Sequence, residues 1–144
     1  STIVRPVFIY GPVIYQVRPS FIQWVQQKLL NGESIKVVTD QLRTPTYVAD
    51  LCEAIATILI FKKAGIYHIA GKDILSPYDM ALTVAKVLDL NTELIEPVTS
   101  ENFPEPVRRA KRSGLYIDKA IRELNYVPHS FEEAVKLSFK KDEA

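Results

Sequence analysis

The stretch DQLRTPTYVADLCEAI, residues 40–55, places a dense group of polar and turn-forming residues directly before an apolar segment. The β-branched residues ahead of it, 35–38, are typical of a short strand, and residues 51–61 are typical of a buried helix. Asp50 and Glu53 have the spacing of a capping box. The stretch therefore predicts a strand that crosses into a helix capped by Asp50, and we expect this helix to be the most buried element.

The segments on either side alternate in type. Strand-like runs, rich in β-branched and aromatic residues, are 2–10, 66–70 and 94–98. Helical spacing, with Ser, Pro, Gly or Asn at several of the expected ends, is found over 21–29, 77–88, 115–124 and 131–139. Strands that alternate with helices through short connections predict an α/β fold with mixed strand pairing.

Composition excludes several classes of protein. The chain has 144 residues, 47% of them hydrophobic, which suits one domain or a piece of one. A net charge of +1 gives no global attraction to nucleic acid or to an acidic membrane. No run approaches the roughly 18 apolar residues of a membrane span. The single Cys52 cannot form an intramolecular disulfide, and its aliphatic neighbours favour an inert, structural thiol. We therefore expect a cytoplasmic protein that binds neither membrane nor nucleic acid.

Few residues could carry chemistry. His68 and His129 lack Cys, Asp or Glu at zinc-ligand spacing, so no metal site is predicted. The five glycines are isolated from one another, which excludes a glycine-rich phosphate turn. A basic cluster, formed by Arg108, Arg109, Lys111 and Arg112, is either a solvated loop or an anion clamp for a diphosphate. A nucleic-acid contact is disfavoured because no aromatic residues are interleaved.

Four segments then carry a resemblance to a known family. They are TIVRPVFIYGP (2–12), DQLRTPTYVADLCEAI (40–55), GIYHIAGKDILSPYDMALTVAKVLDL (65–90) and RRAKRSGLYIDKAIRELNYVPHSFEEAV (108–135). In this order and spacing the chain resembles the C-terminal half of the extended short-chain dehydrogenases/reductases, most closely the dTDP-4-dehydrorhamnose reductase branch. The resemblance implies a fragment of a Rossmann-type α/β protein. Residues 1–12 would be the last Rossmann strand and its turn, residues 13–144 a mixed α/β substrate-binding lobe, and the N-terminal cofactor-binding half would be absent.

The resemblance also implies site residues. Pro6, Val7 and Phe8 match a strand end that lies beside the nicotinamide of NAD(P)H, a cofactor bound mainly by the absent half. Four further residues match, or lie next to, family positions that bind the nucleotide-sugar substrate, and Arg109 matches the position that contacts the diphosphate. These residues are Tyr10, Arg43, Arg109 and Arg112. No catalytic residue is expected, because none of the seven tyrosines is followed four residues later by the lysine that the family's catalytic Tyr requires.

Departures from the family pattern keep three functions open. Arg43 replaces a glycine of the reductases and matches an arginine of the epimerases; Ala110 and Tyr116 replace a Pro and an Asp, and Phe8 replaces a Trp. The favoured hypothesis is the substrate-binding part of an NAD(P)-dependent nucleotide-sugar reductase that is inactive alone. The alternatives are an epimerase or dehydratase of the same superfamily, or a non-catalytic regulatory subunit. A homodimer or a partner enzyme is compatible with each of them.

Overall fold

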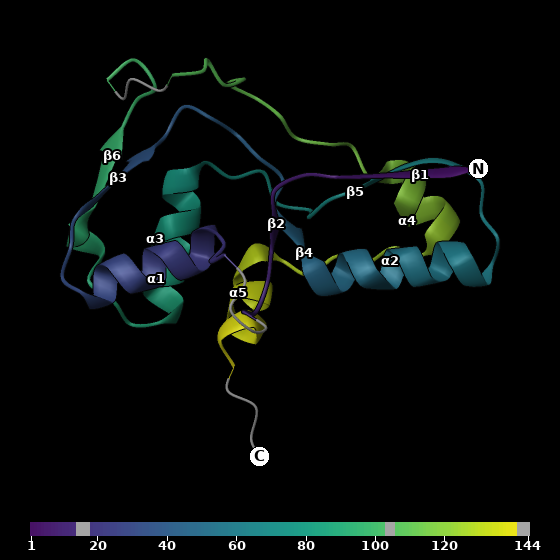
Figure 1. The fold of residues 1–144 in the computed structure, drawn as a ribbon, viewed down its shortest axis with the longest axis horizontal. Helices are drawn as coiled ribbons and strands as arrows, with labels where there is room; N and C mark the ends of the chain where they lie inside the picture. Colours follow the sequence, from purple (N-terminus) through teal and green to yellow (C-terminus); the bar gives the residue numbers. More distant parts are fainter. Residues whose placement is uncertain (14–17, 103–105, 141–144) are drawn as a thin grey trace.

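The computed structural model describes residues 1–13, 18–102 and 106–140 and arranges them in an elongated α/β fold (Figure 1). Its strands are β1 (Thr2–Pro6), β2 (Ile9–Tyr10), β3 (Ile35–Val38), β4 (Thr46–Tyr47), β5 (Gly65–Ile69) and β6 (Ile95–Val98). Its helices are α1 (Phe21–Leu30), α2 (Val48–Ile60), α3 (Pro77–Val87), the short 3-10 helix η1 (Thr92–Leu94), α4 (Asp118–Leu124) and α5 (Phe131–Phe139). Within these described ranges, no helix is long and apolar enough to cross a membrane.

The strands pair in two-stranded ladders, and each ladder is parallel. β1 pairs with β5, β2 with β4, and β3 with β6. An isolated antiparallel bridge joins Arg43 to Leu75. Parallel neighbours require long crossover connections, which the intervening helices provide. The predicted α/β class is confirmed. β3, β5 and β6 lie within one residue of their predicted bounds, the predicted strand 2–10 is divided into β1 and β2, and β4 was not predicted.

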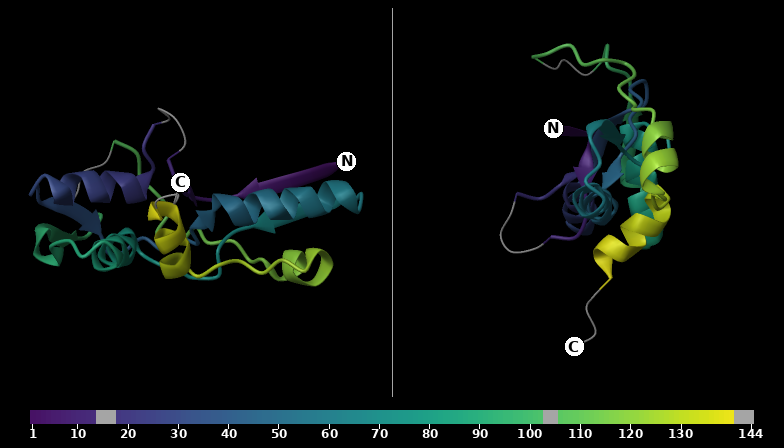
Figure 2. Two further views of the ribbon diagram at one scale, coloured as in Figure 1. Left: turned by 90° about the horizontal axis from the view of Figure 1, so that it is seen from below. Right: turned by 90° about the vertical axis from the view of Figure 1, so that its right-hand side faces the viewer.

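Two apolar cores divide the molecule along its length. The larger core unites α1, α3 and α5 with β3 and β6, and it includes Ile22, Val25, Met80, Val84 and Val135. The smaller core lies between α2, α4 and β5, and it includes Leu51, Ile58, Tyr67, Ile69 and Leu124. Figures 1 and 2 show α1, α3, β3 and β6 at one end of the long axis and α2, α4 and β5 at the other, with β2, β4 and α5 between them.

The first predicted strand, residues 2–10, is broken where the chain passes from one core to the other. Phe8 has a φ of 46°, a left-handed conformation that disfavours a continuous strand. β1 therefore stays with β5, while β2 begins at Ile9 and pairs with β4. The hydroxyl of Thr46 donates to the carbonyl of Val7 and fixes this break against the start of β4.

Two predictions about α2 are wrong. The helix begins at Val48 after Tyr47, so Asp50 is not its cap but lies in its first turn, 2% exposed. Nor is α2 the most buried element: Leu59, Ile60 and Phe61 at its end are about 70% exposed. Cys52 is exposed on the same helix, although its aliphatic neighbours in sequence favoured an inert, structural thiol. A row of apolar residues predicts burial only if neighbours cover all sides of the helix, and the described residues cover one side.

Other helix ends follow the sequence. Ser76 caps α3, with Pro77 at its first position, and the Asp79 amide donates to the Ser76 hydroxyl at 3.1 Å. Asn125 ends α4 with a φ of 51°, the left-handed geometry expected there. Ser130 caps α5. Local capping chemistry thus predicts these ends because it depends on neighbours in sequence.

Candidate functional site

An open cavity of about 490 Å³ lies beside α1 and β3, and three aromatic rings line it. Phe21 and Trp24 are three residues apart on α1 and therefore share one face. Phe8 comes from the break between β1 and β2, where its left-handed backbone directs its ring towards Phe21. The Phe8 and Phe21 centroids lie 5.8 Å apart and those of Phe21 and Trp24 5.9 Å. Such a surface suits a planar ring of a ligand.

Three basic side chains line the same cavity from separate parts of the chain. Arg18 precedes α1, Lys36 lies on β3, and Arg109 belongs to the loop between β6 and α4. All three residues are exposed to solvent. Aromatic rings beside several cations suit a ligand that joins a planar base to phosphate groups.

The loop that carries Arg109 is tied to the stretch that follows β3. Asp40 accepts hydrogen bonds from the Ser100 amide and hydroxyl at 3.0 and 2.6 Å. The bond from the Ser100 hydroxyl lowers the pKa of the Asp40 carboxyl, so Asp40 is ionised at neutral pH. Further along the loop, the Leu42 amide donates to the Lys111 carbonyl at 2.7 Å, and the Ser113 amide donates back to Leu42 at 3.0 Å. Residues 40–42 therefore anchor the loop on both sides of Arg109.

Two other residues predicted to bind the substrate, Arg43 and Arg112, are not among those that line this cavity. Arg43 is 8% exposed, and its guanidinium donates to the carbonyls of Leu42 and Ala110 and to the side chain of Gln41. Its guanidinium thus has three intramolecular acceptors, and the phosphate contact expected from sequence stays a prediction. Arg112 is exposed and joins the backbone bridge to Leu42.

The predicted cofactor residues Pro6, Val7 and Phe8 lie at the carboxyl end of β1. Pro6 is the last residue of the strand and is exposed, whereas Val7 and Phe8 are half-buried. Of the three, Phe8 lines the cavity that Arg109 also lines. The structure therefore brings one predicted cofactor residue and one predicted substrate residue to a single site.

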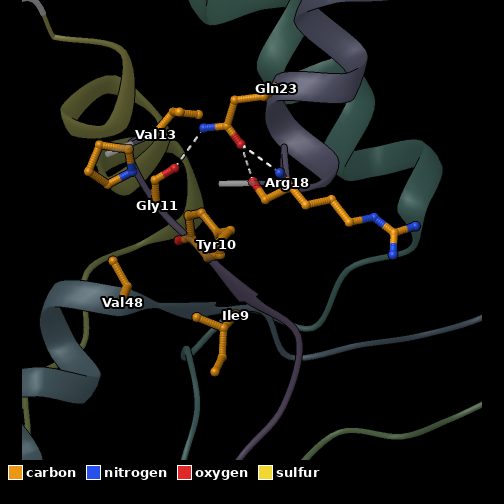
Figure 3. A pocket seen from close by; sticks show the side chains of 9 residues that line it. Ile9, Tyr10, Gly11, Val13, Arg18, Gln23 and Val48 are labelled. Carbon is orange, nitrogen blue, oxygen red and sulfur yellow. Dashed lines mark hydrogen bonds between the residues drawn. The ribbon is translucent and has the colours of Figure 1, made fainter. Parts of the chain in front are cut away.

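A second cavity of about 240 Å³ lies next to β2, and Tyr10 and Arg18 line it (Figure 3). Burial raises the pKa of the Tyr10 phenol, and the nearby charges of Asp50 and Asp73 add to the effect, so the phenol stays protonated. The Gln23 side chain donates to the Gly11 carbonyl at 2.7 Å and closes the cavity against α1. Figure 3 shows the Arg18 side chain extending away from Gly11 and Tyr10. Tyr10 and Arg109 line different cavities, and Arg18 lines both.

Sequence reasoning missed Arg18, Lys36, Phe21 and Trp24. Trp24 carried a usable signal, because it falls on the face of α1 opposite the buried Ile22, Val25 and Leu29, where a tryptophan has no core to fill. Lys36 carried no such signal, because an outward-facing lysine is ordinary on a strand whose side chains alternate between buried and exposed. Among the described residues, no three His, Cys, Asp or Glu side chains come together as a metal site.

Comparison with known proteins gives consistent matches. The family model described as RmlD substrate binding domain matches residues 1–143. Spore coat polysaccharide biosynthesis protein SpsK of Bacillus subtilis is 30% identical over 136 residues, covering 94% of this chain and 46% of that protein. The dTDP-4-dehydrorhamnose reductase of Aggregatibacter actinomycetemcomitans is 26% identical, covering 94% and 49%. A crystal structure of dTDP-4-dehydrorhamnose reductase from Bacillus anthracis with NADP has a TM-score of 0.83 at 27% identity, covering 96% and 47%.

These matches confirm the resemblance that four sequence segments indicated. They also show that the chain spans about half the length of the curated relatives it matches. The fold is that of the extended short-chain dehydrogenases/reductases, of which the 144 residues form a part. Because the family model covers nearly every residue, the chain belongs to the RmlD substrate binding domain family.

Proposed function

We propose that this chain is the substrate-binding part of an NAD(P)-dependent reductase that acts on a dTDP-linked 4-keto sugar. The observation that carries the proposal is the cavity in which Phe8, Phe21 and Trp24 stand beside Arg18, Lys36 and Arg109. The relatives named dTDP-4-dehydrorhamnose reductase support the choice of substrate class.

The cavity residues suggest a division of roles. The aromatic rings would stack against the thymine base, since Trp24 is 37% exposed and Phe21 is half-buried beside it. Arg109 would grip the diphosphate with its planar fork, while Arg18 and Lys36 add positive charge. Fixing the nucleotide in this way would orient the sugar for reaction at the strand break near Phe8.

Catalysis would require residues outside this chain. The isolated glycines do not fit the phosphates of NAD(P)H, whereas the half-buried Val7 and Phe8 at the end of β1 fit an apolar face of its nicotinamide. When bound, NAD(P)H supplies the hydride. The Tyr and Lys pair expected to deliver the proton is also absent from these residues. We therefore propose that the chain is inactive alone and works, in the cytoplasm, as one half of a larger enzyme.

Titration of the full-length protein with dTDP by calorimetry tests the site. We expect Arg109→Ala to weaken dTDP binding about tenfold or more, the worth of a hydrogen bond to a charged group. The matched control is Arg122→Ala on the exposed side of α4, which should leave binding unchanged. Equal affinity of the Arg109→Ala variant and the unmodified protein would refute the diphosphate role.

The alternative of an epimerase or dehydratase is favoured in the sequence by Arg43. The guanidinium of Arg43 donates to Ala110 and Gln41, and this intramolecular role is an alternative to a phosphate contact of the epimerase kind. Reaction stoichiometry separates the classes, since a reductase consumes one NAD(P)H for each sugar and the alternatives regenerate their cofactor. Tight association with another enzyme and no turnover of any nucleotide sugar would favour a regulatory subunit.

A further inference from the structure

We propose that Arg43 is a positioning residue: it fixes the backbone next to Arg109 and thereby holds the Arg109 side chain at the cavity. The inference rests on the proposed function, because it assumes that Arg109 binds the phosphates of the substrate. It assigns Arg43 a role different from the phosphate contact that its sequence position implied. Arg43 would act through Arg109 without touching the ligand.

The contacts of the Arg43 guanidinium span the base of the basic loop. Its Nη1 donates to the Leu42 carbonyl at 2.9 Å and to the Ala110 carbonyl at 3.0 Å. Its Nη2 donates to the Gln41 Oε1 at 2.9 Å. Ala110 directly follows Arg109 in the chain, so the Nη1 bond restrains the peptide group between Ala110 and Lys111, one residue beyond Arg109. Gln41 lines the same cavity, so one guanidinium joins two parts of the cavity wall.

The Arg43 backbone is itself held firmly, so the side chain has a fixed base. The Arg43 amide donates to the Leu75 carbonyl, and the Leu75 amide donates back, both at 2.9 Å. Leu75 immediately precedes Ser76, the buried cap of α3, and α3 packs in the larger core. The proposed restraint therefore runs from the core, through Arg43, to the exposed residue Arg109.

Burial makes these bonds more than surface contacts. Arg43 is 8% exposed, so its bonds are shielded from solvent, and the planar guanidinium can reach three acceptors at once. A lysine would keep the charge but lacks the fork, so it could hold the loop only in part. An uncharged side chain of similar length would leave the Ala110 carbonyl without this donor.

Two ligands separate positioning from a general structural role. Calorimetry on the full-length protein would compare dTDP with thymidine, which lacks the phosphates that Arg109 is proposed to bind. We expect Arg43→Met to weaken dTDP binding about tenfold, as for loss of one charged hydrogen bond, and to leave thymidine binding unchanged. Arg43→Lys should recover part of the dTDP affinity, and the control Arg122→Met should match the unmodified protein. Comparable losses for both ligands would overturn the proposal.

A double-mutant cycle tests the route through Arg109. If Arg43 acts by placing Arg109, then Arg43→Met combined with Arg109→Ala should bind dTDP no more weakly than Arg109→Ala alone. Additive losses would mean that Arg43 acts independently and would overturn the proposal. A wild-type protein that binds neither dTDP nor thymidine would instead contradict the proposed function.

Limited trypsin digestion examines the restraint without any ligand. The loop holds cleavable bonds after Arg108, Arg109, Lys111 and Arg112. We expect Arg43→Met to accelerate cleavage there several-fold, because local opening becomes easier when the bond to Ala110 is lost. The variant Arg122→Met should be cleaved at the wild-type rate. An unchanged cleavage rate in Arg43→Met would overturn the positioning role whether or not dTDP binds.

Discussion

Asp50 illustrates how a residue can satisfy a sequence pattern and yet serve another purpose. Its carboxylate accepts a hydrogen bond from the His129 amide at 2.9 Å and lies 2.6 Å from the His129 Nδ1. The two residues are 79 positions apart, so the contact ties the first turn of α2 to the start of α5. Asp73 supports the same helix start by accepting from the Phe131 amide at 2.7 Å. Two carboxylates thus hold α5 in place.

A pair of substitutions distinguishes this contact from the capping box predicted for Asp50 and Glu53. We expect Asp50→Ala to lower the free energy of unfolding by about 2 kcal/mol, because hydrogen bonds to a buried charged group are lost. Glu53→Ala should change it by less than about 0.5 kcal/mol, since Glu53 is exposed. Urea unfolding followed by circular dichroism measures both values. Equal losses would restore the capping interpretation.

At the scale of elements, α2 differs most from its prediction. Ala54 and Ile58 face the smaller core, whereas Leu59 and Ile60 on the outer side are 70% and 72% exposed. Monomeric proteins seldom expose contiguous apolar surface without a partner for it. The outer side of α2 is thus apolar in sequence and is not covered by the part of the chain that the structure describes.

Alanine substitutions along α2 measure this asymmetry. Ile58→Ala should cost about 3 kcal/mol of unfolding free energy, because it leaves a cavity in the core. The matched change Ile60→Ala removes the same atoms from an exposed position and should cost less than about 0.5 kcal/mol. Chemical denaturation of the 144-residue chain supplies both numbers. Similar costs would mean that the outer side of α2 is covered in solution.

At the scale of the whole molecule, the β1–β5 ladder has open surface. Ile3 and Ile66, opposite each other in register, are 49% and 44% exposed. Parallel sheets are normally covered on both faces and extend over more than two strands. Since the relatives are about twice as long, we expect their additional half to supply both the cover and a strand beside β1.

Hydrogen exchange tests this expectation. Backbone amides of β1 should exchange on the order of tenfold more slowly in the full-length protein than in the 144-residue chain, because a neighbouring strand and helices would protect them. Amides of α3, which is buried in the larger core of either form, serve as the internal control. Equal exchange of β1 in the two proteins would contradict a strand beside it.

The sequence by itself determined what depends on near neighbours. The caps at Ser76 and Ser130, the left-handed end at Asn125 and the alternation of strands with helices follow from the conformations that each local set of residues can adopt. The four family segments also identified Arg109 as a candidate ligand residue, and the structure places it beside Phe8 at one cavity.

Only the tertiary structure decided which distant groups meet. The contacts of Arg43 with Ala110 and of Asp50 with His129 join positions 67 and 79 residues apart, and no local pattern encodes such pairs. Burial of α2 depended in the same way on which neighbours cover each side. Arg18, Lys36 and Arg109 line one cavity because two loops and strand β3 converge beside α1. The physical reason is that packing and charge act through space, whereas capping and strand propensity act along the chain.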